Sequence, residues 1–164
     1  TVAGSGRLAT SCDATRHKVL CQQRDRQQRL ADVIDMRNKM RAHLGSKQES
    51  SQASQEGKGS NFNLKQDAGG IVDIEFMVQF AVLDRSHDFP DLTRWSDNVR
   101  ILECLEEAGV ISAKDAEFLT RAYKNYRSVG HRLQLQKLPV VVDASDFAVE
   151  REQVTAVWDR LLAD

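Results

Sequence analysis

Hydrophobic residues recur every three or four positions along most of the chain, which is the spacing of one face of an α-helix. In the first part of the chain this spacing predicts helices over residues 13–22 and 25–44. The second helix carries a hydrophobic stripe made of Leu30, Val33, Ile34, Met40 and Leu44. Its basic residues lie mostly off that stripe, at Arg26, Arg29, Lys39 and Arg41. We therefore expect an amphipathic helix with a basic outer face.

The helical pattern stops between residues 45 and 60, where Ala53 is the only hydrophobic residue. A segment of this composition cannot offset its ordering entropy by burial, so we expect residues 45–60 to form a mobile polar loop. Polar and hydrophobic residues then alternate briefly, with Phe62 and Leu64 on one side. This alternation predicts one short extended segment near residues 61–65, which is too short to be stable alone.

A helix is predicted over residues 71–83, directly after the diglycine Gly69-Gly70. It is hydrophobic on nearly all sides, and such a helix belongs at the centre of a bundle. Three more helices follow it. The first begins at a cap provided by Thr93 or Ser96.

The second of these three helices opens with a capping box, Ser112 to Asp115, and ends before Pro139. The last covers about residues 147–162. We therefore expect an all-α fold, a helical bundle of about six helices that forms a single domain over residues 1–164. Within it, residues 1–44 are basic N-terminal helices and residues 61–164 form the core of the bundle.

Composition agrees with one globular domain, because 41% of the residues are hydrophobic and 29% are charged. Residues 1–48 hold ten basic and four acidic residues, so the N-terminal end is basic. A solvated helix face explains this asymmetry better than an acidic partner does, and we expect no binding of nucleic acid. No hydrophobic run is long enough to cross a membrane. The chain starts without Met, as a piece of a longer protein would.

The cysteines are three in number and show neither disulfide nor zinc-ligand spacing. A reducing cytoplasm suits such a chain best, and no metal site is expected. The three residues are Cys12, Cys21 and Cys104.

Residues 63–79 are the one segment whose pattern suggests chemistry. Gly69 and Gly70 at a helix start let a ligand or another backbone approach, and the unpaired amides there favour an anion. Lys65 could add a positive charge, so this segment could form a phosphate-binding corner. The alternative is that the two glycines form only a tight turn and Lys65 is solvated.

Two carboxylates sit inside the hydrophobic helix 71–83, where an unpaired charge is costly. Asp73 is placed to complement the positive end of the helix dipole. Glu75 and Gln79 share one face and could meet a cation on the helix that opens at Ser112 and ends before Pro139. The candidate cations are Arg127, His131 and Arg132. An internal ion pair and a site role are both compatible with this pattern.

The segment also offers an apparent nucleotidyltransferase signature, a Gly-Ser turn at Gly59-Ser60 followed by Asp73 and Glu75. Two carboxylates at this spacing converge on a metal only if the backbone is a strand. The surrounding hydrophobic pattern is helical, so we expect the two carboxylates to diverge and to hold no metal.

Three motifs resemble one known family. They are Phe62 to Phe76 followed by Gln79, Met36 to Gly45, and Leu92 to Glu103, and they occur in the family's order. The chain is similar to the helical domain that follows the C-terminal nucleotidyltransferase domain of the bifunctional glutamine synthetase adenylyltransferases/adenylyl-removing enzymes.

The resemblance implies a long cytoplasmic enzyme with two nucleotidyltransferase domains. One half transfers AMP from ATP to a tyrosine of glutamine synthetase, and the other removes it by phosphorolysis. ATP and magnesium would serve the parent enzyme, while this fragment would need no cofactor to fold. The implied partners are glutamine synthetase, the PII signal protein and the preceding nucleotidyltransferase domain, with no membrane involved.

By the same resemblance, five residues would border the nucleotide cleft: Lys65, Gly69, Gly70, Asp73 and Glu75. Gln79, Arg127 and His131 would be their polar partners. No catalytic residue is expected in the chain, since the family's metal-binding carboxylates would lie before residue 1. The chain alone should therefore be inactive. The alternative is a regulatory module that binds PII or glutamine synthetase without contacting nucleotide.

Overall fold

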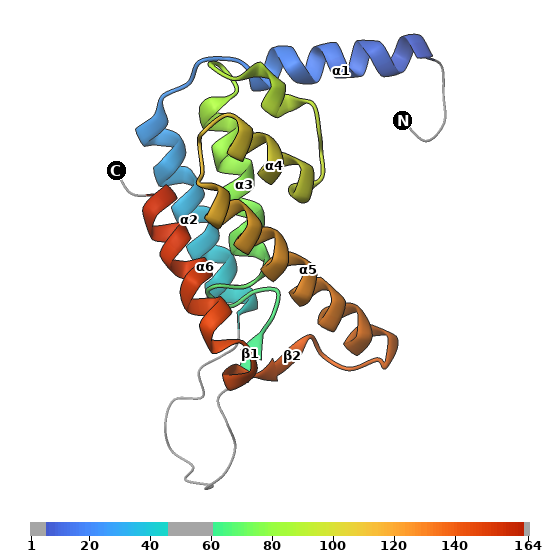
Figure 1. Ribbon diagram of the computed structural model, residues 1–164, viewed down its shortest axis with the longest axis vertical. Coiled ribbons are helices and arrows are strands. Elements are labelled where there is room, and N and C mark those ends of the chain that lie inside the picture. The colour runs from blue at the N-terminus through green and yellow to red at the C-terminus, as the bar shows by residue number, and fades with distance from the viewer. Residues whose placement is uncertain (1–5, 46–60, 163–164) are drawn as a thin grey trace, which may run out of the picture.

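The computed structural model describes residues 6–45 and 61–162, and its architecture is a bundle of α-helices with one very small sheet (Figure 1). The prediction of an all-α fold is confirmed. Residues 46–60 of the predicted loop, including Gly59 and Ser60, lie outside the described residues. The helices are α1 (Gly6–Leu20), α2 (Arg26–Leu44), α3 (Ile71–Arg85), α4 (Asn98–Glu107), α5 (Ala113–Leu135) and α6 (Ala148–Leu161).

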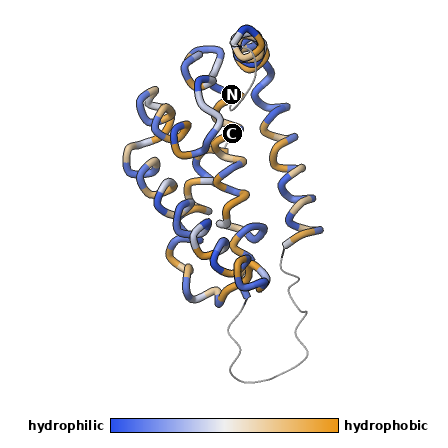
Figure 2. The backbone as a smooth tube through the Cα atoms, turned by 90° about the vertical axis from the view of Figure 1, so that its right-hand side faces the viewer, coloured by the Kyte–Doolittle hydropathy of each residue, from blue (hydrophilic) through white to orange (hydrophobic). Residues whose placement is uncertain are grey.

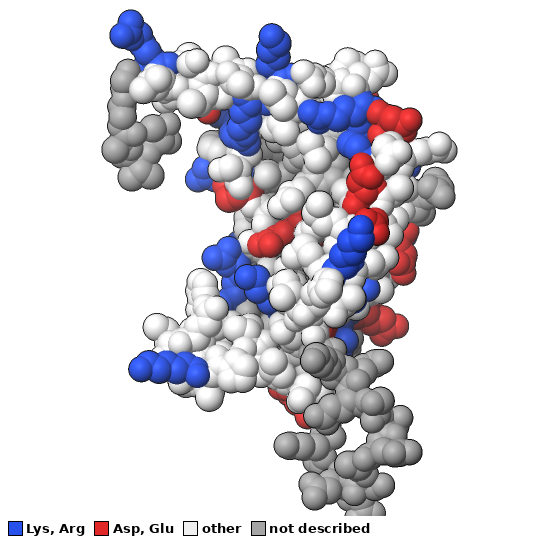
Figure 3. Space-filling model, turned by 180° about the vertical axis from the view of Figure 1, so that it is seen from behind, with Lys and Arg blue, Asp and Glu red and all other residues white. Residues whose placement is uncertain are grey.

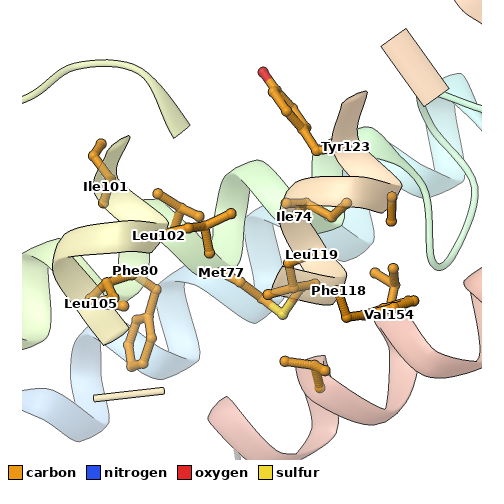
Figure 4. Close-up of a cluster of buried hydrophobic side chains, with 14 of the residues drawn as sticks. Ile74, Met77, Phe80, Ile101, Leu102, Leu105, Phe118, Leu119, Tyr123 and Val154 are labelled. Atoms are coloured by element: carbon orange, nitrogen blue, oxygen red, sulfur yellow. The ribbon is translucent and has the colours of Figure 1, made fainter. Parts of the chain in front are cut away.

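Helix α3 occupies the centre of the bundle and contacts α2, α4, α5 and α6. Its residues Ile74, Met77 and Phe80 pack against hydrophobic side chains of α4, α5 and α6 (Figure 4). The central position predicted for residues 71–83 is confirmed, because a helix that is hydrophobic on nearly all sides can be buried only among other helices. Hydrophobic and hydrophilic residues alternate along the outer helices, as their one-sided burial requires (Figure 2).

The two-stranded sheet joins segments far apart in the sequence. Strand β1 (Asn61–Asn63) pairs antiparallel with β2 (Val141–Asp143), with Phe62 opposite Val142. The extended segment near residues 61–65 was predicted, but its partner β2 was not. Phe62 is fully buried, so the short strand is held by packing as well as by pairing.

Helix boundaries follow local capping. Ser112 caps α5 as predicted, with Oγ accepting from the Asp115 amide at 3.1 Å. The cap predicted for α4 is wrong, because Asp97 provides it by accepting from the Arg100 amide at 3.1 Å. Thr93 instead ends the short 3-10 helix η1 (Pro90–Thr93) and donates to the Pro90 carbonyl. A second 3-10 helix, η2 (Ala144–Phe147), leads into α6.

Helix α1 lies across one end of the bundle and has no buried residue (Figure 1). It begins at Gly6 and ends at Leu20, which corrects the predicted span of residues 13–22. Arg16 donates to the Trp95 carbonyl, and the His17 ring lies 2.9 Å from the Thr93 hydroxyl. Among the helices that the structure describes, none has the length and hydrophobicity needed to cross a membrane.

Candidate functional site

The diglycine brings two other backbone segments close to the start of α3. Gly69 has φ +78°, and a Cβ there would lie 2.6 Å from the Arg151 carbonyl oxygen on α6. At Gly70 a Cβ would lie 2.7 Å from the Leu64 carbonyl oxygen. Any side chain at either position would therefore clash with backbone atoms. The sequence allowed either a ligand or another backbone to approach here, and the structure has another backbone.

The amides that would hold an anion at this helix start are hydrogen bonded within the chain. Ile71 donates to the Leu64 carbonyl at 2.9 Å and Val72 to the Lys65 carbonyl at 3.2 Å. The Gly70 amide donates to the Asp67 carbonyl, and the Gly69 amide to Asp73 Oδ2 at 2.7 Å. The tight-turn interpretation accounts for these contacts. The place of the diglycine at a nucleotide cleft stays a prediction.

Asp73 is buried in an ion pair between α3 and α2. Its Oδ1 lies 2.5 Å from Arg37 Nε, and the side chains of Asp73 and Arg37 are 3% and 0% exposed. Arg41 adds a longer contact of 3.4 Å. Arg37 also donates to the Gln66 carbonyl at 2.7 Å, which fixes the turn before α3. Asp73 does complement the start of its helix, as predicted, by accepting from the Gly69 amide, and its ion pairs are with α2.

The outer face of α2 is less basic than predicted. The Arg29 side chain is 13% exposed and lies 2.7 Å from Asp84 of α3. Arg26 approaches the same carboxylate at 3.5 Å. With Arg41 directed to Asp73, three of the four basic residues assigned to the outer face make ion pairs with α3. That prediction is therefore wrong for these three, because the carboxylates of α3 attract them inward.

Glu75 leaves α3 on another side and meets α5. Its Oε1 accepts from the Tyr123 hydroxyl at 3.2 Å. That hydroxyl accepts in turn from Arg127 Nη1 and from Asn98 Nδ2, each at 3.0 Å. The Tyr123 ring lines the hydrophobic core while its oxygen points away from it (Figure 4). Tyr123 thus links α3, α4 and α5 through one hydroxyl group.

Hydrogen bonding to the Tyr123 hydroxyl raises the pKa of Arg127, so its guanidinium keeps its charge. Arg127, one of the cations predicted to face Glu75, is therefore linked to Glu75 by the Tyr123 hydroxyl that lies between them. Within the described residues Glu75 forms no ion pair with Arg127, His131 or Arg132. Gln79 is exposed to solvent, away from this network.

Four of the residues selected from the sequence meet in one small hollow between α3 and α5. Lys65, Glu75, Arg127 and His131 line it, and its volume is about 200 Å³. Gly69, Gly70 and Asp73 lie outside its lining, on the side of α3 that faces α2 and α6. The structure therefore divides the predicted site into two parts. Gly69, Gly70 and Asp73 pack α3 against α2 and α6, and the other four residues line the polar hollow, which we call the smaller hollow.

A second hollow of about 680 Å³ adjoins the smaller one and shares Arg127 and His131 with it. It lies between the start of α4 and the outer face of α5, and we call it the larger hollow. Asp97, Asn98, Tyr123, Lys124 and Ser128 are among its other lining residues. On the concave flank that Figure 3 shows from behind, lysine and arginine side chains lie beside acidic ones.

Asp73 and Glu75 do not form a magnesium site together. Asp73 is directed to α2 and Glu75 to α5, so their oxygens do not converge. The helical interpretation of this segment is confirmed, since residues 71–76 belong to α3. No group of three or more His, Cys, Asp or Glu residues could hold a metal ion in the part of the chain that the structure describes.

Two residues of the site were missed in the sequence. Arg37 follows Val33 and Ile34 at helical spacing, so a charged residue inside a hydrophobic stripe was the available signal. Tyr123 falls on the hydrophobic spacing of its own helix, which predicts a core position, and its ring does lie there. Nothing in the spacing tells where its hydroxyl points.

Comparison with known proteins gives one family and a consistent group of relatives. A family model described as GlnD PII-uridylyltransferase matches residues 34–138, which is more than half of the chain. The chain is 46% identical over 162 residues to the bifunctional glutamine synthetase adenylyltransferase/adenylyl-removing enzyme of Pseudomonas putida, covering 98% of this chain and 17% of that protein.

Two further proteins with the same name are similar to the chain. The protein from Hahella chejuensis is 44% identical over 163 residues, covering 99% of this chain and 16% of that protein. The protein from Pseudomonas aeruginosa is 46% identical over 167 residues, covering 98% and 16% respectively. The chain thus spans about one sixth of the length of these relatives.

Proposed function

The chain belongs to the family that the GlnD PII-uridylyltransferase model describes, and from this premise we propose that it is the helical domain of a longer enzyme that adenylylates glutamine synthetase. The observation that carries the proposal is the identity of 44–46% to bifunctional glutamine synthetase adenylyltransferase/adenylyl-removing enzymes over nearly the whole chain. The parent enzyme would transfer AMP from ATP to a tyrosine of glutamine synthetase in the cytoplasm.

The helical domain is non-catalytic by itself in this proposal. Two-metal phosphoryl transfer needs carboxylates that converge on magnesium. Asp73 is engaged by Arg37 and Glu75 by Tyr123, which supports placing the metal-binding carboxylates in another domain of the parent. The preceding nucleotidyltransferase domain would supply them.

The smaller hollow would face the nucleotide cleft of that neighbouring domain. Its exposed Lys65 and its Arg127 can contribute positive charge where phosphates are held. Glu75 would hold the Tyr123 and Arg127 side chains in place from the side of α3. The diglycine and Asp73 would support the site indirectly, by fixing the start of α3 against α2 and α6.

The experiment compares the 164-residue chain with the parent enzyme. Each is incubated with glutamine synthetase, magnesium and ATP labelled in the α-phosphate, and label in glutamine synthetase is counted. We expect incorporation by the parent and none by the chain, with circular dichroism showing that the chain is folded. Turnover by the chain alone would refute its non-catalytic role. A parent enzyme that leaves glutamine synthetase unlabelled would refute the proposed activity.

A second candidate is a regulatory module that binds PII or glutamine synthetase without touching nucleotide. Helix α1 favours it, since Leu8 and Val19 are 67% and 45% exposed on a helix with no buried residue. Pull-down of each partner by the chain, set beside a titration with ATP, separates the two candidates. Binding of a partner without any binding of ATP would favour the regulatory module.

A further inference from the structure

The larger hollow is lined by more basic side chains than acidic ones. Lys124, Arg127 and His131 lie along one face of α5 and line it together. Its one carboxylate, Asp97, already accepts from the Arg100 amide and lies 3.8 Å from Arg100 Nε. Lys124 has no side-chain partner in the described parts of the chain.

The guanidinium of Arg127 is exposed yet held in one orientation. Its Nη1 donates to the Tyr123 hydroxyl at 3.0 Å, and its carbon lies 5.5 Å from the centre of the Tyr123 ring. The hydroxyl is itself fixed by Asn98 and Glu75. Arg127 is therefore positioned by a hydroxyl group, and the charge of Glu75 acts on its guanidinium without a direct ion pair in the described residues. Its other N–H groups are left for a ligand.

We propose that the larger hollow binds a phosphate group, with Arg127 and Lys124 contacting its oxygens and Tyr123 acting as a positioning residue. A phosphate offers several acceptor oxygens to converging donors, and a guanidinium fork matches them in pairs. The Ser128 hydroxyl, in the same lining, adds a neutral donor. A volume of about 680 Å³ accommodates a diphosphate with an organic group attached.

This inference goes beyond the proposed function, which assigns only the smaller hollow to the nucleotide cleft. The charges of the hollow would hold the phosphate of a nucleotide and a free diphosphate equally. Only the expectation that the phosphate comes from a nucleotide rests on the proposed function. Binding by the 164-residue chain is measured without glutamine synthetase. A failure of binding and a failure of adenylylation are thus separate results.

The test is calorimetric titration of the chain at low salt with pyrophosphate, ATP and adenosine. We expect pyrophosphate and ATP to bind and adenosine not to bind. Arg127→Ala should lower the affinity for pyrophosphate by about tenfold or more, and Arg127→Lys, which keeps the charge without the fork, by less. The matched control is Arg132→Ala, because Arg132 lies on the same helix but outside both hollows. This substitution should change the affinity for pyrophosphate by less than about twofold.

The positioning role of Tyr123 is tested by comparing the effect of Tyr123→Phe with and without the Arg127 side chain. Tyr123→Phe should weaken pyrophosphate binding in the natural chain and have no further effect in the Arg127→Ala variant, since its hydroxyl acts on the ligand only by holding the guanidinium. An equal loss in both backgrounds would overturn the positioning role. Binding of adenosine without pyrophosphate, or equal losses in Arg127→Ala and Arg132→Ala, would overturn the phosphate site.

Discussion

Asp73 of α3 and Arg37 of α2 form an ion pair that is almost wholly removed from solvent, with 2.5 Å between Oδ1 and Nε. A buried charge is tolerated only when it is paired and hydrogen bonded. Arg37 meets this condition by also donating to the Gln66 carbonyl, and Asp73 by accepting from the Gly69 amide. The pair therefore joins α2, the turn before α3 and α3 itself.

Removing one partner of this ion pair should strongly destabilise the folded chain. We expect Arg37→Ala to lower the free energy of unfolding by about 3–5 kcal/mol, because Asp73 is left as a buried unpaired charge. Arg41→Ala is the control, since Arg41 is 36% exposed and lies 3.4 Å from the same carboxylate. Urea unfolding followed by circular dichroism gives both values. Equal losses in the two variants would contradict the dominant role of Arg37.

The packing role of the diglycine gives a second prediction. Gly69→Ala should destabilise the chain more than Gly109→Ala does. Both glycines have positive φ, +78° and +68°, so both substitutions strain the backbone by about 1–2 kcal/mol. Only at Gly69 would the new Cβ also meet a backbone, that of Arg151, whereas nothing lies within 4 Å at Gly109. Similar midpoints of urea unfolding for the two variants would show that α6 does not approach Gly69 closely.

Two tyrosines, one turn apart on α5, offer a matched comparison. The Tyr126 hydroxyl is buried without a hydrogen-bond partner in the described structure, whereas the Tyr123 hydroxyl has three. We expect Tyr126→Phe to raise the free energy of unfolding by about 1 kcal/mol and Tyr123→Phe to lower it by about as much. Thermal unfolding of the three proteins checks both signs, and a loss in Tyr126→Phe would reveal a partner for its hydroxyl.

The same tyrosine predicts a dependence of stability on pH. Burial raises the pKa of the Tyr126 phenol, and the carboxylate of Glu150 adds to the effect. The phenol then loses its proton at a lower pH in the unfolded chain than in the folded chain. The free energy of unfolding is therefore unaffected by this proton below the ordinary tyrosine pKa of about 10 and decreases above it. Between pH values of about 9 and 11 the natural chain should lose stability more steeply than Tyr126→Phe. Parallel curves would contradict this.

Local patterns explain how much of the fold could be predicted. The central helix was found because Ile74, Val78 and Phe80 belong to a pattern that is hydrophobic on several sides, which only a bundle centre can bury. The cap at Ser112 was found because its partner is three residues away. Strand β2 was missed because three residues carry too little pattern, and its pairing with β1 is decided by tertiary packing.

The site was only partly predictable for the same reason. The helical period places Glu75 and Asp73 on different sides of α3, and they do diverge. Which residues they meet depends on how α2 and α5 pack, and no spacing within one helix reveals that Arg37 or Tyr123 lies opposite. Four residues predicted around one cleft do share a hollow, namely Lys65, Glu75, Arg127 and His131, while the cleft itself stays a prediction.

The most direct test of the proposed site is adenylylation of glutamine synthetase by the parent enzyme carrying Lys65→Ala, measured as labelled AMP transferred per minute. Lys65 is exposed in the lining of the smaller hollow, so its loss should leave the unfolding midpoint unchanged while lowering the rate by about tenfold or more. Arg132→Ala, exposed on α5 outside that hollow, should keep both the rate and the midpoint. A Lys65→Ala enzyme with the full rate would contradict a role for this hollow at the nucleotide cleft.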